Sequence, residues 1–447
     1  MTNYKPFGFA LLLLAGAASC DTTVVNPGPV GDDFLSDRNA AAALTAGAGR
    51  ALSSAINWVS YTGAAVTREI HPAGSTGSFG ITNRWQAGEL AADDADNDTH
   101  WEQASRARWL GEEAVRRLEA AGPPPAGSLQ TLTAYNNVLQ LAYLWAGFAN
   151  RLLGENMCDA VIDGGALQAG ATVFLQRAES LFTKAIAVTG GTATTMLAQS
   201  TAAYGGRAAV RVHLGNWPGA IADAALVPIA FVYNMPYYNI GDDAQRNRIF
   251  FSSGNSRESG SAYRAHTQWN TWHLLYKYGT ATPTAATVAV TADPRITIGI
   301  TTLLGDAAID CCGKVPFFPE AKHLSSAAPI RLTSGREMQL IRAEEQLRAS
   351  SDVTGMAFIN AARTNAGAPT ITNINLTDAW RLLKRERGIE LWLEARRMGD
   401  LRRWLAGATP GALDALETVG ALTSHLTSQS LCFPVSRSER ETNPNVP

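Results

Sequence analysis

The sequence lacks every short motif that marks a common catalytic centre. Its seven histidines stand singly, with no H-x-x-x-H or H-E-x-x-H pair, so a metal protease would have no ligand set. It also has no G-x-S-x-G, no P-loop and no G-x-G-x-x-G on a strand. We therefore expect no catalytic residues and no cofactor. A glycoside hydrolase needs only two carboxylates, so that enzyme class stays a minor alternative.

Charge is scarce, and long apolar runs are missing beyond the N-terminus. Charged residues are 17% of the chain and the net charge is −2, so nothing in the composition favours binding to nucleic acid. Beyond residue 18, no segment approaches the ~20 apolar residues of a spanning helix. Apolar residues still reach 46%, and a chain of this length can bury a sizeable core.

The N-terminus has the features of an export signal. Lys5 precedes a short apolar run, and small residues then lead into Cys20. This order predicts a signal peptide over residues 1–19. Because the segment ends on cysteine, it resembles a bacterial lipobox, which would make Cys20 the lipidated first residue of a membrane-anchored protein. Residues 20–35 would form the tether. A plain signal peptide with an incidental cysteine is the alternative.

Four further cysteines can form disulfides in an exported protein, namely Cys158, Cys311, Cys312 and Cys432. Three pairings are possible, including a bridge between the adjacent Cys311 and Cys312. We expect Cys158 to bond to one member of that adjacent pair.

No metal ion is expected. The cysteines lack C-x-x-C spacing and a companion histidine pair, which argues against zinc. The acidic run at residues 93–98 resembles a calcium loop but lacks the required glycine and glutamate, so a solvated loop is favoured over an ion site.

Helical periodicity covers much of the chain on both sides of a central segment. The predicted helices span residues 40–56, 100–121, 129–153, 173–188, 201–214, 218–226, 336–347, 355–366 and 377–404. Residues 57–92 are predicted to be irregular loop. Residues 229–333 are predicted to form a loop-rich lobe. This lobe would separate a helical region, 36–228, from a C-terminal region, 334–447. The turn at 215–218 suits a tight connection between helices. Its surroundings resemble tetratricopeptide repeats.

Residues 385–404 combine many charged side chains with apolar ones near helical spacing. The pattern predicts an amphipathic helix docked on a core. Glu386, Glu390 and Glu394 would share one face, where like charges repel. We therefore expect basic groups, some near in sequence and some from elsewhere, to build a carboxylate–guanidinium network that fixes one packing arrangement.

This stretch resembles the signature of the SusD/RagB family of outer-membrane nutrient-binding lipoproteins, R-R-x-E-L-x-x-E-G-x-R-x-x-D-L-R-R-W. The matching positions are Arg385, Arg387, Glu390, Leu391, Glu394, Arg396 or Arg397, Asp400, Leu401, Arg402, Arg403 and Trp404. Further family-like segments occur at residues 337–344, 358–367 and 432–444. Gly388 departs from the signature.

The resemblance implies a mostly α fold, a helical tetratricopeptide-like scaffold with a loop-rich second lobe. It also implies a non-enzymatic protein on the outer membrane that captures an oligomeric nutrient, glycan first and peptide second, for a SusC-type TonB-dependent transporter. A repeat scaffold that binds only a protein partner is the alternative.

Two aromatic-rich segments are the candidate ligand sites, because exposed aromatic rings together with amide and guanidinium donors bind sugars and peptides. The first holds Trp58, Tyr61, Arg84 and Trp85, and the second holds Tyr263, Trp269, Asn270 and Trp272. The alternative is that these rings are core. Core is favoured for Trp58 and Trp85, and in the second segment a helix could bury Trp269, Trp272 and Tyr276.

Overall fold

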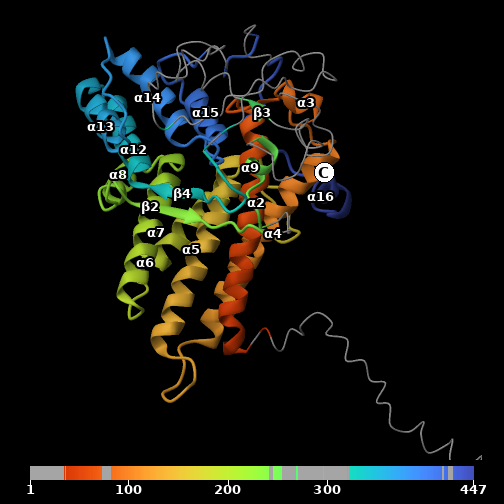
Figure 1. Ribbon diagram of the computed structural model, residues 1–447. Coiled ribbons are helices and arrows are strands. Elements are labelled where there is room, and N and C mark those ends of the chain that lie inside the picture. The colour runs from red at the N-terminus through yellow and green to blue at the C-terminus, as the bar shows by residue number, and fades with distance from the viewer. Residues whose placement is uncertain are drawn as a thin grey trace, which may run out of the picture.

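The computed structural model describes residues 35, 37–72, 82–240, 245–253, 268–269, 295, 320, 322–414, 417–420 and 426–447. The fold is mostly α-helical, as predicted. Long helices α2 (Ala41–Val66), α4 (Ala95–Ala121), α5 (Leu132–Asn156), α6 (Thr172–Ala187) and α7 (Ala193–His213) stand side by side, and C-terminal helices gather at one end of them (Figure 1). The signal peptide, the tether with Cys20, and most of the predicted loop-rich lobe lie outside the described residues. The predicted division into regions stays a prediction.

The remaining elements are short or belong to the C-terminal part. Short helical segments are η1 (Arg38–Ala40), α3 (Asn83–Gln86), α8 (Trp217–Ala224), α9 (Arg248–Ser253) and α16 (Arg437–Thr442). The C-terminal helices are α12 (Gly335–Arg348), α13 (Asp352–Asn365), α14 (Leu376–Glu390) and α15 (Arg397–Ala406). Two antiparallel pairs join β1 (His71–Pro72) to β3 (Gln268–Trp269), and β2 (Val232–Met235) to β4 (Ile330–Ser334).

Glycine and capping residues end the helices where the sequence predicts. Helix α4 stops at Ala121, and Gly122 follows with φ +65° before the proline run. Between α7 and α8, Gly215 takes φ +76° and the Asn216 side chain accepts a hydrogen bond from the Gly219 backbone N–H. The tight connection predicted at residues 215–218 is thereby confirmed.

Helix α2 continues ten residues beyond its predicted end at residue 56, so the loop predicted from residue 57 is wrong as far as Val66. The segment looks loop-like because it is rich in Ser, Thr and Gly. Within the helix these hydroxyls bond to the backbone: Ser60 Oγ donates to the Ile56 carbonyl at 2.5 Å, and Thr67 Oγ1 donates to the Gly63 carbonyl at 2.7 Å. Tertiary burial therefore overrides local propensity here.

The single helix predicted over residues 377–404 is also wrong, because a corner at residues 391–396 separates α14 from α15. Leu393 and Ala395 adopt positive φ values of 61° and 59°, which no α-helix tolerates. The indole Nε1 of Trp392 donates to the Glu69 carbonyl at 2.9 Å, and the Leu393 N–H donates to Glu69 Oε1 at 2.9 Å. Contacts with the end of α2 thus hold the turn.

Candidate functional site

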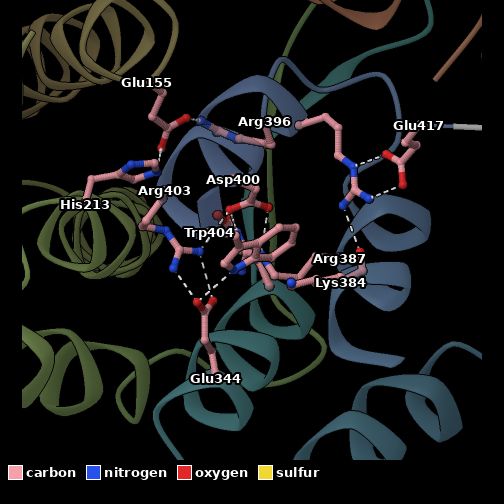
Figure 2. Close-up of polar contacts among 12 residues, drawn as sticks. Glu155, His213, Glu344, Lys384, Arg387, Arg396, Asp400, Arg403, Trp404 and Glu417 are labelled. Carbon is pink, nitrogen blue, oxygen red and sulfur yellow. Dashed lines mark hydrogen bonds and ion pairs between the residues drawn. The ribbon is translucent and has the colours of Figure 1, made fainter. Parts of the chain in front are cut away.

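The family-like stretch builds a buried ion-pair network, called here the clasp (residues 386–404 with their partners). Figure 2 shows its inner part, where Arg387 and Asp400 form two hydrogen bonds of 2.7 and 2.8 Å. Arg396 reaches Glu155 of α5 at 2.5 Å, and Arg403 pairs with Glu344 of α12. Except for Arg403, whose side chain is 15% exposed, these charges are almost wholly buried. Because burial removes most of the net gain from such pairs, the clasp specifies one arrangement of helices more than it adds stability.

The three glutamates on the predicted shared face find partners far away in sequence. Glu386 pairs with Arg295 at 2.8 Å and with Arg363, Glu390 pairs with Arg331 at 2.7 Å, and Glu394 pairs with Lys322 at 2.7 Å. The arginines three residues away contribute little: Arg387, three residues before Glu390, pairs with Asp400, and Arg397, three residues after Glu394, pairs with Glu417. The predicted network exists, and distant basic residues supply most of it.

Ion pairing keeps three clasp carboxylates, Glu155, Glu394 and Asp400, ionised. Burial acts to raise the pKa of Glu155, but the guanidinium groups of Arg151 and Arg396 outweigh it and hold that pKa well below its usual range. Burial opposes ionisation of Asp400 and Glu394 as well, and their basic partners again lower the pKa overall. These groups are consequently poor proton donors near neutral pH.

The corner beside the clasp contains an unusual carboxyl group. Burial raises the pKa of Glu69 to about 7, although the Leu393 N–H and the charges of Arg397 and Lys322 oppose this. Arg68, next to it, has φ +65°. Non-glycine residues with positive φ persist where the surrounding structure over-determines them, so Glu69 directly follows a strained backbone position.

The residues of the first predicted ligand segment differ in their exposure. Trp58 lies on α2, partly exposed, with the Arg248 guanidinium 3.4 Å from its ring centroid. Arg84 is exposed and pairs with Glu89 at 2.6 Å and with Asp93 at 3.1 Å. Trp58 and Arg84 remain candidate contact residues.

Tyr61 and Trp85 are core residues instead. Both have 0% exposure, and Trp85 meets the His100 ring edge-on at 5.2 Å, while His100 stacks on Phe433 at 4.8 Å. A ring with no exposed face cannot stack on a ligand, so the contact role predicted for these two residues is wrong in this conformation. The alternative core reading holds for Trp85.

The second predicted segment is described only at residues 268–269. Trp269 lies on β3 opposite His71 of β1, so the helix that could have buried it does not form at that position. Tyr263, Asn270 and Trp272 lie outside the described residues. The β1–β3 pair nevertheless places residues 268–269 of this segment beside the chain that follows α2.

The predicted disulfide partner of Cys158 is wrong. Cys158 bonds to Cys432, with 4.9 Å between their Cα atoms. The pairing arises because residues 156–158 run beside Phe433: its N–H donates to the Asn156 carbonyl at 2.7 Å, and the Cys158 N–H donates to the Phe433 carbonyl at 2.9 Å. Cys311 and Cys312 lie outside the described residues.

Metal and membrane sites are absent from the part of the chain that is described. No group of three or more His, Cys, Asp or Glu side chains there could hold a metal ion. The acidic run at 93–98 enters the first turn of α4 rather than forming a free loop, and Asp98 accepts a hydrogen bond from the Ser438 N–H at 3.3 Å. No described helix is both long and apolar enough to span a bilayer.

Sequence reasoning missed Arg248 and His100, which organise the aromatic cluster around Trp58. Arg248 comes from α9, and its backbone N–H donates to Asn57 Oδ1 at 3.0 Å. His100 Nε2 lies 2.6 Å from Thr62 Oγ1. No sequence signal joins residues so far apart, since neither belongs to a motif.

Known proteins resemble this chain both in its C-terminal sequence and in its fold. The SusD family model matches residues 330–445, whereas no curated protein matches. A SusD homolog from Bacteroides thetaiotaomicron superposes with a TM-score of 0.64 at 12% identity, covering 90% of this chain and 94% of its own. A SusD-like protein from Bacteroides fragilis gives 0.63 at 12% identity, covering 93% and 98%.

A further similar structure was crystallised with a xylogluco-oligosaccharide. It has a TM-score of 0.58 at 16% identity and covers 83% of this chain and 84% of its own. These solved structures have the same fold as this chain. The family model shows, in addition, that the C-terminal sequence is similar to that of SusD proteins. Residues 330–445 thus match the SusD family in sequence, and the chain shares its fold with SusD-superfamily structures.

Proposed function

We propose that the protein is a lipid-anchored outer-membrane protein that binds an oligomeric nutrient and passes it to a SusC-type TonB-dependent transporter. The observation that carries this proposal is the SusD family match over residues 330–445, whose signature builds the clasp. A glycan is the favoured ligand because a protein of the same fold was crystallised with a xylogluco-oligosaccharide. A peptide is the second candidate.

The ligand is expected near the end of α2, where residues 268–269 of the second aromatic segment pair with β1. Trp58 and Arg248 offer a ring and a guanidinium there, and the β1–β3 pair adjoins the segment that holds Tyr263, Asn270 and Trp272. A few polar donors around aromatic rings are the chemistry of small-molecule sites. The role of the second segment stays a prediction from its sequence.

The clasp fits a structural role better than a catalytic one. Its carboxylates are buried against guanidinium groups, and those of Glu155, Glu394 and Asp400 have lowered pKa values. A glycoside hydrolase needs one carboxyl group that stays protonated near neutral pH, and Glu69, whose pKa burial raises to about 7, is only 2% exposed and so is out of reach of a glycan. Incubation of the purified protein with glycans should release no new reducing ends, and their appearance would revive the enzyme alternative.

An affinity screen over oligosaccharides and peptides tests the proposal most directly. We expect binding to one class, reduced by Trp58→Ala. Trp109→Ala is the matched control, because Trp109 is half exposed on α4 and outside the aromatic cluster. If neither class binds, the proposal fails and the scaffold that binds only a protein partner becomes the better explanation.

The anchor can be tested separately from ligand binding. In cells fed a labelled fatty acid, the wild-type chain should carry the label and sediment with outer membranes, and Cys20→Ser should do neither. Unlabelled wild-type protein would contradict the lipoprotein assignment. Co-purification with a TonB-dependent barrel from those membranes would support the expected partner.

A further inference from the structure

The end of the helical bundle opposite the clasp is formed by two turns and by the chain that enters α2. The turn between α4 and α5 and the turn between α6 and α7 both lie there (Figure 1). Arg38 donates to the Gly122 carbonyl at 2.7 Å, and the Thr192 N–H donates to Asn137 Oδ1 at 2.8 Å. We call this surface the anchor end, and it comprises residues 37–40, 122–135 and 188–197.

Both turns of the anchor end lack charged side chains. No Asp, Glu, Lys or Arg occurs between Glu119 and Arg151, nor between Lys184 and Arg207. Charged residues are mostly found on protein surfaces, so their absence from two exposed turns is unusual. The nearest charges at the edge of the turns compensate each other, because Lys184 pairs with Glu119 at 2.8 Å.

Leucine side chains project from these uncharged turns. Leu129, a few residues after a run of three prolines, is 99% exposed, and Leu132 at the start of α5 is 53% exposed. Leu197, near the start of α7, is 69% exposed. Single exposed apolar residues are normal on a protein surface. Three of them at one end, on turns without charge, instead indicate a surface that contacts an apolar partner.

The proposed lipid anchor is joined to the same end. Residues 21–34 separate Cys20 from Leu35, which precedes η1, and a chain of that length spans at most about 50 Å. Helix α5 has 25 residues and leads from the anchor end to the clasp, about 37 Å away. Of the two ends of the bundle, the anchor end is therefore the one that the lipid holds near the membrane.

Attachment makes a weak contact effective. Tethering turns contact with the bilayer into an intramolecular event, so a few side chains that could not hold a free protein there can still enter the lipid. Leucine side chains are stabilised when they leave water for the bilayer interface. In addition, the two turns carry no carboxylate that lipid phosphates would repel.

We propose that the anchor end contacts the lipid surface, with Leu129, Leu132 and Leu197 entering its interfacial region. The proposal rests on the proposed function in that Cys20 carries the lipid. It adds an interaction surface and an orientation of the molecule. Helix α2 would lead away from the membrane, and its 26 residues would place Val66, near which the ligand is expected, about 39 Å further out.

Hydrogen–deuterium exchange tests the contact. The lipidated full-length mature protein is anchored to vesicles of phosphatidylethanolamine and phosphatidylglycerol, and Cys20→Ser protein mixed with the same vesicles is the unanchored reference. Peptides from residues 126–135 should exchange about threefold more slowly, or slower still, in the anchored protein, because insertion excludes water from their amides. Peptides from residues 366–376, between α13 and α14, should exchange equally in both samples.

Variants identify the side chains responsible. Leu129→Asp combined with Leu197→Asp should restore the faster exchange, because a carboxylate opposes entry into the lipid. Both positions are exposed, so the fold should be retained. Ile374→Asp is the matched control, since Ile374 is 88% exposed between α13 and α14. This variant should leave the slow exchange of the anchored protein unchanged.

The outcomes separate this proposal from the proposed function. If the protein carries a fatty acid but its turns exchange equally with and without the anchor, the lipid contact is wrong while the proposed function stands. If the turns exchange slowly in Cys20→Ser as well, another part of the chain or a second copy covers them, and the contact is again wrong. Slow exchange in isolated outer membranes but not in vesicles would assign the surface to a membrane protein instead. If no fatty acid is attached, the lipoprotein assignment itself fails, and the lipid contact fails with it.

Discussion

At the scale of single residues, Gly47 and Gly49 occupy the same helix but different surroundings. Replacing Gly47 by alanine should raise stability by about 0.5–1 kcal/mol, because glycine is a poor helix former and the new methyl group meets nothing. Gly49→Ala should lower stability by about 1–3 kcal/mol, since its Cβ would lie 2.9 Å from the buried Trp145 indole. Chemical unfolding measures both, and equal changes would contradict the packing.

Glu69 should make stability depend on pH. Its folded pKa of about 7 exceeds the ordinary 4.5, so the folded state binds the proton more tightly than the unfolded chain does. This contribution is complete below pH 4.5 and is lost as the pH rises through 7. Glu69→Gln should therefore be more stable than the wild type at pH 8, by roughly 3 kcal/mol relative to their difference at pH 4.

His213 provides a control of opposite sign. Burial lowers its pKa from 6.5 to about 4 despite the nearby Glu155 carboxylate, so the folded state favours the neutral ring and loses stability as the pH falls below 6.5. His213→Gln should remove that loss. Thermal unfolding at several pH values distinguishes the two variants, and parallel curves for both would refute the assigned shifts.

At the scale of elements, the clasp decides how α14 and α15 sit against the earlier helices. Asp400→Asn leaves the buried Arg387 without its carboxylate partner and should cost about 3–5 kcal/mol. Glu441→Gln is the control, because its pair with Arg437 is 51% and 64% exposed, and it should change stability by less than about 1 kcal/mol. Urea unfolding compares them.

The helices were largely predictable because their ends carry local signals. Gly122 and Gly215 stop helices by taking positive φ, a property readable from the residue itself. The corner at residues 391–396 has no such signal, since Leu393 and Ala395 adopt positive φ where Glu69 accepts from the Leu393 N–H and Asn156 Nδ2 donates to the Ala395 carbonyl. Glu69 and Leu393 lie far apart in the sequence. Helical periodicity alone therefore predicted one helix that continues through the corner.

The candidate site was less predictable for the same reason. Trp58 and Trp85 have identical side chains in one aromatic-rich segment, yet one is partly exposed under Arg248 and the other fully buried against His100. The difference in burial between these two tryptophans depends on contacts with α9 and α4. The sequence of the segment gives no information about those contacts.

At the scale of the whole molecule, the Cys158–Cys432 bond joins the end of α5 to the C-terminal segment. Replacing both cysteines by serine should lower the free energy of unfolding by about 2–4 kcal/mol, because the bond restricts the unfolded chain. Peptide mapping without reductant should recover the two cysteines in one linked fragment. A link from Cys158 to Cys311 or Cys312 would contradict the structure.

The same bond closes a covalent ring, because the two cysteines are 274 positions apart in sequence. A protease that cuts the chain once anywhere inside this ring opens it without releasing a piece. Such a nicked molecule would keep its full mass on a gel run without reductant and would separate into two fragments only after reduction. For a protein proposed to stand outside the cell among secreted proteases, one cut would therefore leave both halves on the same anchor.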